Sequence, residues 1–296
     1  MNGKASPFVK WAGGKTQLLK EIETRLPLNF GTTIKKYAEP FVGGGSVFLH
    51  LLQHYDIKET YISDINCELV TTYRTIKEDV EGLIDALSEI ESQYIPLSLD
   101  ERKDYFYHKR AHYNLIKKDS NSDLDIAAHF IFLNRTCFNG LYRVNSKGDF
   151  NVPSGRYKNP LICNAKNLNN VSRLLKNVQI VCGDYKQSDS FIDENTFVYF
   201  DPPYRPLDTT SNFTSYTKDD FNDDDQIQLS QYIHHLSEKG AFILASNSDP
   251  KNINPSDDFF DVLYSPLHIE RIGAARLISS KTKSRGKVSE LLIRNY

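Results

Sequence analysis

The stretch FVYFDPPYRPL, Phe197 to Leu207, consists of two unlike halves. Its first four residues form an unbroken apolar and aromatic run, which is typical of a strand buried on both faces of a sheet. The run stops at Asp201, which is followed by two prolines and Tyr204. We therefore predict a central strand whose carboxyl end presents a carboxylate, a stiff turn and an aromatic ring together.

Strand and helix patterns alternate on both sides of this stretch. Further strand patterns lie at residues 32–41, 59–64, 177–184, 240–247 and 287–295. Helical patterns lie at residues 46–54, 66–77 and 223–236. The chain is therefore predicted to be an α/β protein.

The middle of the chain interrupts this alternation. From about residue 77 to about residue 135 helical patterns dominate, and the stretch LYRVNSKGDFNVP then alternates around Ser-Lys-Gly-Asp as a hairpin-like loop does. We predict a sheet domain formed by residues 1–70 and 163–296, and an inserted helical domain, residues 71–162, that includes a hairpin loop at 137–160.

The composition is that of an ordinary globular protein, with 40% hydrophobic and 25% charged residues among 296. No apolar run approaches the roughly 20 residues needed to span a bilayer, and the N-terminal stretch MNGKASPFVKWAGGK has no signal-peptide core, which favours a cytoplasmic location. The cysteines are scattered and lack histidine neighbours, so we expect free thiols and no metal or disulfide framework: Cys67, Cys137, Cys163 and Cys182.

Two basic segments stand out against the net charge of −2. Residues 134–160 carry five basic side chains and one acidic one, and residues 270–296 carry seven basic and two acidic ones. Lys281, Lys283 and Arg285 lie close together in the second segment. On an otherwise acidic chain, such segments favour a local site for a polyanion, although solvated surface faces would give the same pattern.

The glycine-rich turn EPFVGGGSVF, residues 39–48, joins a strand to a helix. Glycines allow close approach of a ligand to the backbone, and a helix N-terminus favours negative groups. Asp64 ends the next strand 20 residues after Gly44, where a nucleotide-binding unit places an acid for ribose hydroxyls. Phe48 stands in place of the third glycine of the nucleotide-binding pattern, and a plain tight turn remains the alternative.

A second glycine-containing stretch, KWAGGK, extends from Lys10 to Lys15. It combines the indole of Trp11 with two ammonium groups, a combination that suits an aromatic ligand bearing a carboxylate. An exposed turn before a helix is the alternative interpretation.

The opening stretch itself indicates a chemistry. In open α/β sheets ligands bind at the carboxyl ends of the strands. There Asp201 and the Pro202 carbonyl offer two hydrogen-bond acceptors, and Tyr204 offers a flat face. This set fits an exocyclic amino group on a planar base, whose lone pair the two acceptors would direct toward an incoming methyl group.

The motifs DPPY, FVGGG and KWAGGK together resemble those of the Dam-type, alpha-class DNA adenine methyltransferases, and the resemblance covers essentially the whole chain. It extends to FNGLYRVNSKGDFNVPSGRYKNP, NFTSYT and RGKVSELLIRNY, and is particularly close to members that methylate GATC. It implies a Rossmann-like sheet dependent on S-adenosylmethionine, an inserted DNA-recognition domain, double-stranded DNA as partner, and N6 methylation of a flipped adenine.

The resemblance also implies residue roles. The catalytic residues would be Asp201, Pro202 and Tyr204. The cofactor would be bound by Trp11, Lys15, Phe41, Gly43, Asp64, Asp184 and Asp201. Arg143 would bond a guanine in the major groove, although a phosphate contact is the alternative, and further DNA contacts would come from Lys10, Phe138, Asn139, Leu141, Pro153 and Tyr157.

Two other functions stay open at this point. The first is the same chemistry on RNA or on a protein amide, against which the hairpin loop weighs. The second is an inactive protein that only binds a DNA site, against which the intact Asp201, Tyr204 and KWAGGK weigh. A cytosine carbon methyltransferase is a poor fit, because none of the cysteines lies in a Pro-Cys turn.

Overall fold

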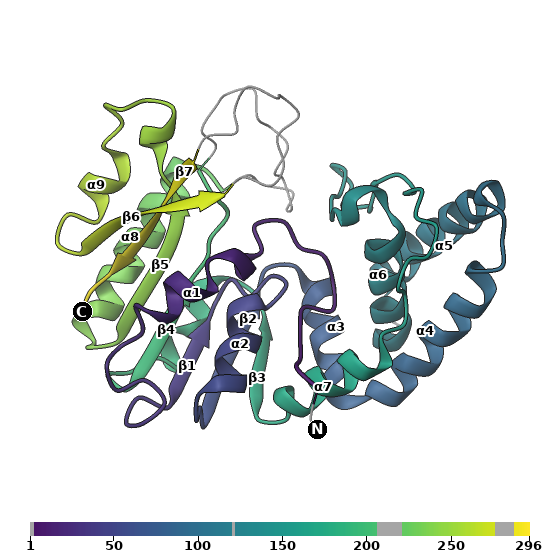
Figure 1. Cartoon of the computed structure of the whole chain (residues 1–296), viewed down its shortest axis with the longest axis horizontal. Helices are drawn as coiled ribbons and strands as arrows, with labels where there is room; N and C mark the ends of the chain where they lie inside the picture. Colours follow the sequence, from purple (N-terminus) through teal and green to yellow (C-terminus); the bar gives the residue numbers. More distant parts are fainter. Residues whose placement is uncertain (1–2, 120–121, 206–220, 276–286) are drawn as a thin grey trace.

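In the computed structural model, which describes residues 3–119, 122–205, 221–275 and 287–296, a seven-stranded sheet carries helices on both faces, and further helices lie beyond one of its edges (Figure 1). The strand order is β3-β2-β1-β4-β5-β7-β6. The strands are β1 Lys36–Glu39, β2 Glu59–Asp64, β3 Val178–Cys182, β4 Thr196–Phe200, β5 Phe242–Ser248, β6 His268–Ala275 and β7 Lys287–Arg294.

Strand β4 lies at the centre of this sheet, as its sequence predicts. It pairs in parallel with β1 on one side and β5 on the other. All five of its residues are buried. Strand β7 is antiparallel to both β5 and β6. The carboxyl ends of β1 to β5 therefore meet at one edge, and Asp201 emerges in the middle of it.

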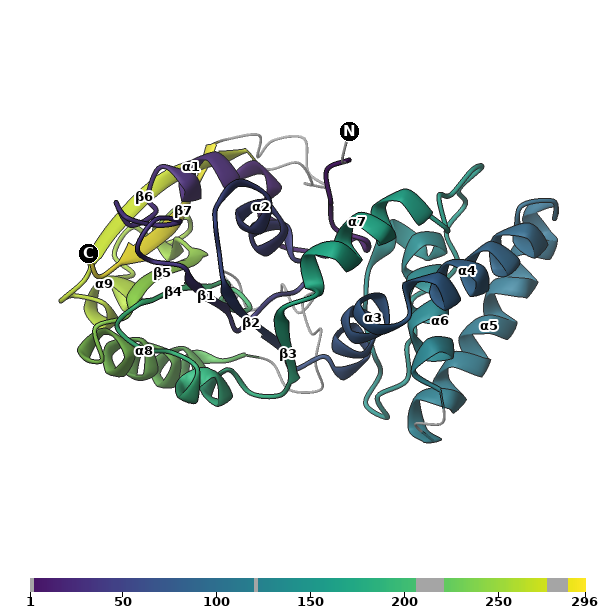
Figure 2. The same cartoon turned by 90° about the horizontal axis from the view of Figure 1, so that it is seen from below.

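Two hydrophobic cores cover the two faces of the sheet. Along β4, Phe197 and Tyr199 belong to one core, and Val198 and Phe200 belong to the other. Figure 2 shows the helices that complete each core on opposite sides of the strands. The first face is covered by α1 Leu19–Glu23, α2 Ser46–His54 and α7 Ala165–Leu175, and the second by α8 Asp223–Glu238 and α9 Phe259–Leu263.

The helical part lies beyond edge strand β3 (Figure 1). Its helices are α3 Cys67–Glu78, α4 Val80–Tyr94, α5 Leu99–Asp119 and α6 Asp123–Thr136. Helix α6 is the central one, because α3, α4 and α5 all pack against it and its residues 126–134 are buried on every side. The first core runs from the sheet into this helical part without a break. Helix α3 contacts the sheet strands β2 and β3 as well as α6 of the helical part. The predicted domain boundary between residues 70 and 71 falls within this helix and stays a prediction.

The region after α6 contains two isolated antiparallel bridges and no regular strand in residues 137–160. Val144 and Phe150 form an antiparallel bridge, and Cys137 and Ser154 form another. The turn between Val144 and Phe150 is closed by Asn145, whose side-chain oxygen accepts the N–H groups of Lys147 and Asp149.

The prediction of four free cysteines is wrong. Cys67 and Cys182 form a disulfide, whereas Cys137 and Cys163 are free. The two partners are 115 residues apart in sequence, and their Cα atoms lie 5.2 Å apart. They meet because β2 and β3 pair in parallel, with Asp64 opposite Cys182, and because α3 begins at Cys67, three residues after β2 ends.

Two general features concern the described part of the chain only. None of its helices has the length and apolar character needed to cross a membrane. Its His, Cys, Asp and Glu side chains form no group of three or more that could hold a metal ion.

Candidate active site

Asp201 follows the last residue of β4 at the carboxyl edge of the sheet. Pro202, next in the chain, is buried, and one fifth of the Asp201 side chain is exposed. Burial raises the pKa of the Asp201 carboxyl above its ordinary value, although Lys15 and Ser246 act in the opposite direction. The result is a carboxylate held at a partly enclosed position that a ligand can reach.

Lys15 joins the KWAGGK stretch to the DPPY motif. Its side chain is 5% exposed, and its ammonium lies 2.7 Å from Asp201 Oδ1 and 2.8 Å from the Gly13 carbonyl. The same ammonium stands 4.4 Å from the centre of the Tyr204 ring. The Tyr204 hydroxyl donates a hydrogen bond of 2.7 Å to Glu290 Oε2 on β7. Three segments far apart in sequence therefore converge on one carboxylate and one aromatic face.

The glycine-rich turn lies beside these groups and touches Trp11. Gly43 (φ +47°) and Gly45 (φ +72°) adopt the left-handed backbone that favours glycine. A Cβ atom at Gly43 would stand 2.8 Å from the indole of Trp11, and one at Gly45 would collide with the Tyr73 hydroxyl. Trp11 in turn stacks on Tyr142 of the helical part, with ring centres 5.8 Å apart. Only glycine therefore allows the turn and Trp11 to approach so closely.

Asp64 holds the glycine-rich turn in place from the end of β2. Its two carboxylate oxygens accept the N–H groups of Gly43 at 3.0 Å and of Asn66 at 2.9 Å. Burial raises the pKa of this carboxyl, while these backbone donors act against the increase. Each oxygen keeps a further lone pair, so Asp64 can accept hydrogen bonds from a ligand as well.

Phe41 and Asp184 lie at the ends of β1 and β3. Phe41 stacks on Tyr185 with ring centres 5.3 Å apart. Asp184 is exposed and caps the short helix Tyr185–Ser190, accepting the Lys186 N–H at 2.8 Å. Together with Asp64 and Trp11 they place aromatic faces and carboxylates along the edge formed by β1, β2 and β3.

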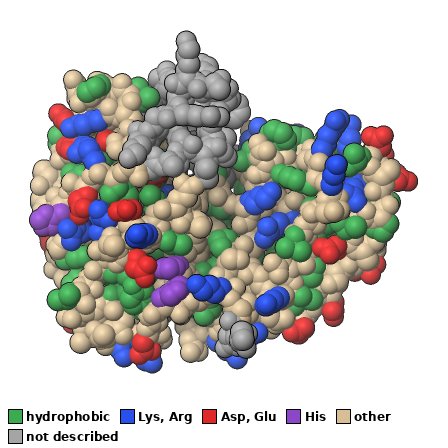
Figure 3. All heavy atoms as spheres, in the orientation of Figure 1, with side chains coloured by type: hydrophobic (Ala, Val, Ile, Leu, Met, Phe, Trp, Pro, Cys, Tyr) green, Lys and Arg blue, Asp and Glu red, His purple; other side chains and the backbone are tan. Residues whose placement is uncertain are grey.

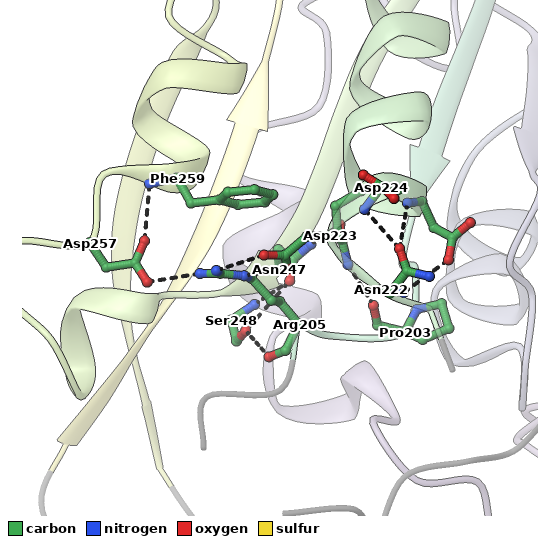
Figure 4. Close-up of polar contacts among 11 residues, drawn as sticks. Pro203, Arg205, Asn222, Asp223, Asp224, Asn247, Ser248, Asp257 and Phe259 are labelled. Carbon is green, nitrogen blue, oxygen red and sulfur yellow. Dashed lines mark hydrogen bonds and ion pairs between the residues drawn. The ribbon is translucent and has the colours of Figure 1, made fainter. Parts of the chain in front are cut away.

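Arg205 holds the chain immediately after the DPPY motif (Figure 4). Its guanidinium forms two hydrogen bonds to Asp223, of 2.7 and 2.9 Å, and one of 2.8 Å to Asp257. It also lies 4.2 Å from the centre of the Phe259 ring. Since Asp223 begins α8 and Asp257 precedes α9, one side chain ties the motif to two helices on the same face of the sheet.

Buried polar side chains bind the backbone of the same motif. Gln226 donates to the Pro203 carbonyl at 3.0 Å, and its own oxygen accepts a hydrogen bond from Asn247. Ser248 donates to the Arg205 carbonyl at 3.2 Å. These three side chains are almost fully buried. They were not predicted from the sequence, where the only signal is a polar Ser-Asn-Ser at the end of an apolar strand.

The residues that the resemblance associates with DNA lie in the helical part and next to it. The Lys10 ammonium lies 4.5 Å from the centre of the Tyr157 ring, and the Lys10 backbone exchanges two hydrogen bonds with Asn134 of α6. Phe138 is 52% exposed, although its N–H is bonded to the Pro153 carbonyl. The structure thus brings residues 10, 138, 153 and 157 to one region.

Asn139, Leu141 and Arg143 follow along the same loop. All three are exposed, and Asn139 adopts a left-handed backbone with φ +56°. The Arg143 guanidinium is held by Asn151 across the hairpin at 2.7 Å. Lys281, Lys283 and Arg285 lie outside the described residues. Figure 3 shows lysine and arginine side chains on the visible face of the helical part, with acidic side chains toward its outer rim.

Comparison with known proteins agrees with the resemblance of the sequence motifs to DNA adenine methyltransferases. The family model described as D12 class N6 adenine-specific DNA methyltransferase matches residues 11–278. That match includes Trp11, the glycine-rich turn and the DPPY motif, and it spans most of the chain.

Individual relatives are similar over nearly their whole length. The type II methyltransferase M.MjaIII of Methanocaldococcus jannaschii is 50% identical over 99% of this chain and 100% of its own. The type II methyltransferase M1.LlaDCHI of Lactococcus lactis subsp. cremoris is 38% identical over 98% and 95%. The DNA adenine methylase of Escherichia coli K12 is 34% identical over 98% and 95%.

Proposed function

The chain belongs to the D12 class of N6 adenine-specific DNA methyltransferases, and we propose that it transfers a methyl group from S-adenosylmethionine to the adenine of GATC in duplex DNA. The observation that carries the proposal is the convergence of Asp201, Tyr204 and Lys15 at the end of β4, beside the turn of Gly43. A cytoplasmic location is part of the proposal.

The residues present fit S-adenosylmethionine. Gly43 lets the glycine-rich turn lie against the indole of Trp11, because a Cβ there would stand 2.8 Å from it, and Asp64 beside the turn keeps lone pairs for a ligand. Trp11, Lys15, Phe41, Gly43, Asp64, Asp184 and Asp201 would hold the cofactor, with Asp64 accepting hydrogen bonds from its ribose hydroxyls. When bound, it would supply an electrophilic methyl group.

The chain's own groups act on the target base. The Asp201 carboxylate and the Pro202 carbonyl each accept a hydrogen bond from the adenine amino group. These two bonds direct the nitrogen lone pair toward the methyl group to be transferred. Tyr204 stacks on the base, and Glu290 fixes the Tyr204 ring through its hydroxyl. The proton that the methylated nitrogen must lose is adjacent to the Asp201 carboxylate. Because the Lys15 ammonium faces the Tyr204 ring, it must yield the space over that ring to the base.

Access to the base requires flipping. The adenine amino group is paired inside a duplex, and extruding the base costs a few kcal/mol. Exposed Phe138 would enter the gap in the base stack and Asn139 the space that the base leaves. Lys10, Leu141, Pro153 and Tyr157 would make neighbouring contacts, with Lys10 near the first guanine.

Sequence specificity is assigned to Arg143. A guanidinium can bond both acceptors of a guanine in the major groove, which is worth about 1–3 kcal/mol of discrimination. Arg143 is exposed on the hairpin, and Asn151 orients its guanidinium, which supports this role. With Arg143→Ala, we expect activity on sites with that guanine replaced to approach activity on GATC. A uniform loss on all sequences would instead make Arg143 a phosphate contact.

The proposed site is tested directly on plasmid DNA. Radiolabelled methyl transfer is first measured on duplex DNA, RNA and protein, and label is expected in duplex DNA alone. The methylated plasmid is then treated with a nuclease that adenine methylation of GATC blocks, and protection is expected. Complete cutting after methyl incorporation would show that another sequence is methylated. The M. jannaschii and L. lactis relatives are named type II methyltransferases, which supports a role of this kind, in restriction-modification, for the chain.

A further inference from the structure

A chain of two buried hydroxyls ends on the Asp201 carboxylate. The Ser246 hydroxyl of β5 lies 3.0 Å from Asp201 Oδ1 and 3.0 Å from the Tyr199 hydroxyl of β4. Ser246 is 1% exposed and Tyr199 is fully buried. They meet because β4 and β5 pair in parallel with Phe200 opposite Ala245, which places Ser246 alongside Asp201.

The direction of this chain follows from its chemistry. A serine hydroxyl has one hydrogen, and an ionised carboxylate can only accept. Ser246 therefore donates to Asp201, since its other acceptor, the Phe200 carbonyl, is farther away at 3.4 Å. With its hydrogen committed, Ser246 can only accept from Tyr199. The order is Tyr199 to Ser246 to Asp201.

The chain occupies one particular oxygen of Asp201. Oδ1 receives both Ser246 and the Lys15 ammonium. Among the residues that the structure describes, none forms a hydrogen bond with Oδ2. Rotation about the Cβ–Cγ bond of an aspartate is broad and roughly two-fold, so Lys15 alone, on a flexible stem, would leave the plane of the carboxylate loosely fixed.

We propose that Ser246 and Tyr199 are positioning residues that fix the Asp201 carboxylate so that Oδ2 faces the target amino group. The proposal rests on the proposed function of Asp201 as acceptor for that group. Ser246 acts through Asp201, and Tyr199 acts through Ser246. Neither touches the base or the cofactor.

The test is the maximal rate of methyl transfer at saturating DNA and S-adenosylmethionine. For Ser246→Ala we expect a fall of about 10- to 100-fold, as for other groups that orient a ligating side chain, with the two KM values unchanged. Ser246→Thr, which keeps the hydroxyl, should recover most of the rate. Tyr199→Phe should lower the rate less, and adding it to Ser246→Ala should cause no further loss, because Tyr199 acts only through Ser246.

A second buried hydroxyl pair provides the matched control. Tyr232 and Ser188 also lie 3.0 Å apart, but Ser188 passes its hydrogen to the Tyr185 carbonyl and not to a carboxylate. Ser188→Ala and Tyr232→Phe should therefore lower the melting temperature about as much as the Ser246 and Tyr199 variants do, and keep the maximal rate. Equal rate losses in both pairs would make the effect one of stability and overturn the proposal.

The outcome is separable from that of the proposed function. A Ser246→Ala enzyme that stays within twofold of wild type, while Asp201→Ala is inactive, would refute the positioning role alone. Turnover in Asp201→Ala would instead refute the acceptor role itself. If Ser246→Ala fails to fold, Tyr199→Phe, which keeps the ring, still decides: a rate equal to wild type would refute the proposal.

Discussion

Replacing Asp201 by alanine should abolish methyl transfer and also destabilise the protein, and the structure allows the two effects to be separated. Asp201 is the acceptor proposed for the target amino group. Loss of one such partner of the reacting group is expected to reduce the rate on the order of 10²-fold or more, by analogy with a single oxyanion-hole donor. The same change leaves the Lys15 ammonium, 5% exposed, without its carboxylate.

The cost of that unpaired charge can be estimated. Breaking a buried ion pair by removing one partner costs about 3–5 kcal/mol, and the lower value applies because the Asp201 side chain is 20% exposed. For a chain of this length, about 3 kcal/mol corresponds to a fall of roughly 6 °C in melting temperature. In Lys15→Met/Asp201→Ala the charge is gone, so stability should return in part, while the rate should not.

The helical part offers an ion pair of nearly the same geometry as a control. Lys117 and Glu68 lie 2.9 Å apart with side chains 7% and 23% exposed, against 2.7 Å, 5% and 20% for Lys15 and Asp201. Glu68→Ala should therefore lower the melting temperature to a similar extent but leave turnover near wild type.

The assay combines thermal unfolding with single-turnover methyl transfer on duplex DNA. The expected pattern is similar melting temperatures for Asp201→Ala and Glu68→Ala with rates at least 10²-fold apart. Near-normal turnover in a folded Asp201→Ala protein would refute the reasoning. Equal rate losses in both variants would show that lost stability, and not a lost acceptor, explains the result.

Three further outcomes are expected. Burial raises the pKa of the Asp201 carboxyl above 3.8, its ordinary value, and protonation weakens the carboxyl as a hydrogen-bond acceptor. The single-turnover rate should therefore fall on acidification with a midpoint above 3.8; a midpoint at or below that value would contradict this. The Cys67–Cys182 disulfide closes a loop of 115 residues, which should stabilise the fold by about 4–5 kcal/mol. Reductant should therefore lower the melting temperature of the wild type but not that of Cys182→Ser. Equal unfolding curves of the wild type with and without reductant would argue against the bond. DNA with 2-aminopurine at the target position should fluoresce more strongly on binding, because the base leaves the stack. Tyr204→Ala should weaken that signal, since losing a stacking energy of roughly 1–3 kcal/mol per base lowers the flipped population. Unchanged fluorescence despite tight binding would argue against flipping.

The parts of the fold that the sequence predicts are those governed by local patterns. The run Phe197–Phe200 is apolar without interruption, which is typical of a strand covered on both faces, and β4 is that strand. The long helices α4, α5 and α6 coincide with helical periodicity. Strand β6, by contrast, was missed, because an edge strand with charged residues such as Glu270 and Arg271 lacks the apolar signal of a buried one.

What escaped prediction depends on contacts between distant segments. Cys67 and Cys182 have no sequence signal, since their meeting follows from the parallel pairing of β2 and β3. Nothing in the sequence distinguishes Glu290 from other acidic residues. Its carboxylate meets the Tyr204 hydroxyl only because β7 pairs with β5. The candidate site could be located from its motifs, but the side chains that support it could not, because they come from other strands and helices.

The position of β7 has a consequence for the timing of synthesis. This strand contains almost the last residues of the chain, yet it lies inside the sheet between β5 and β6 and carries the partner of Tyr204. The KWAGGK stretch precedes Asp201 by nearly 190 residues, so the ion pair of Lys15 can form only once both segments have been synthesised. We therefore expect the site to be complete only once β7 has been synthesised, and a gene truncated before residue 287 to yield a protein that cannot modify DNA.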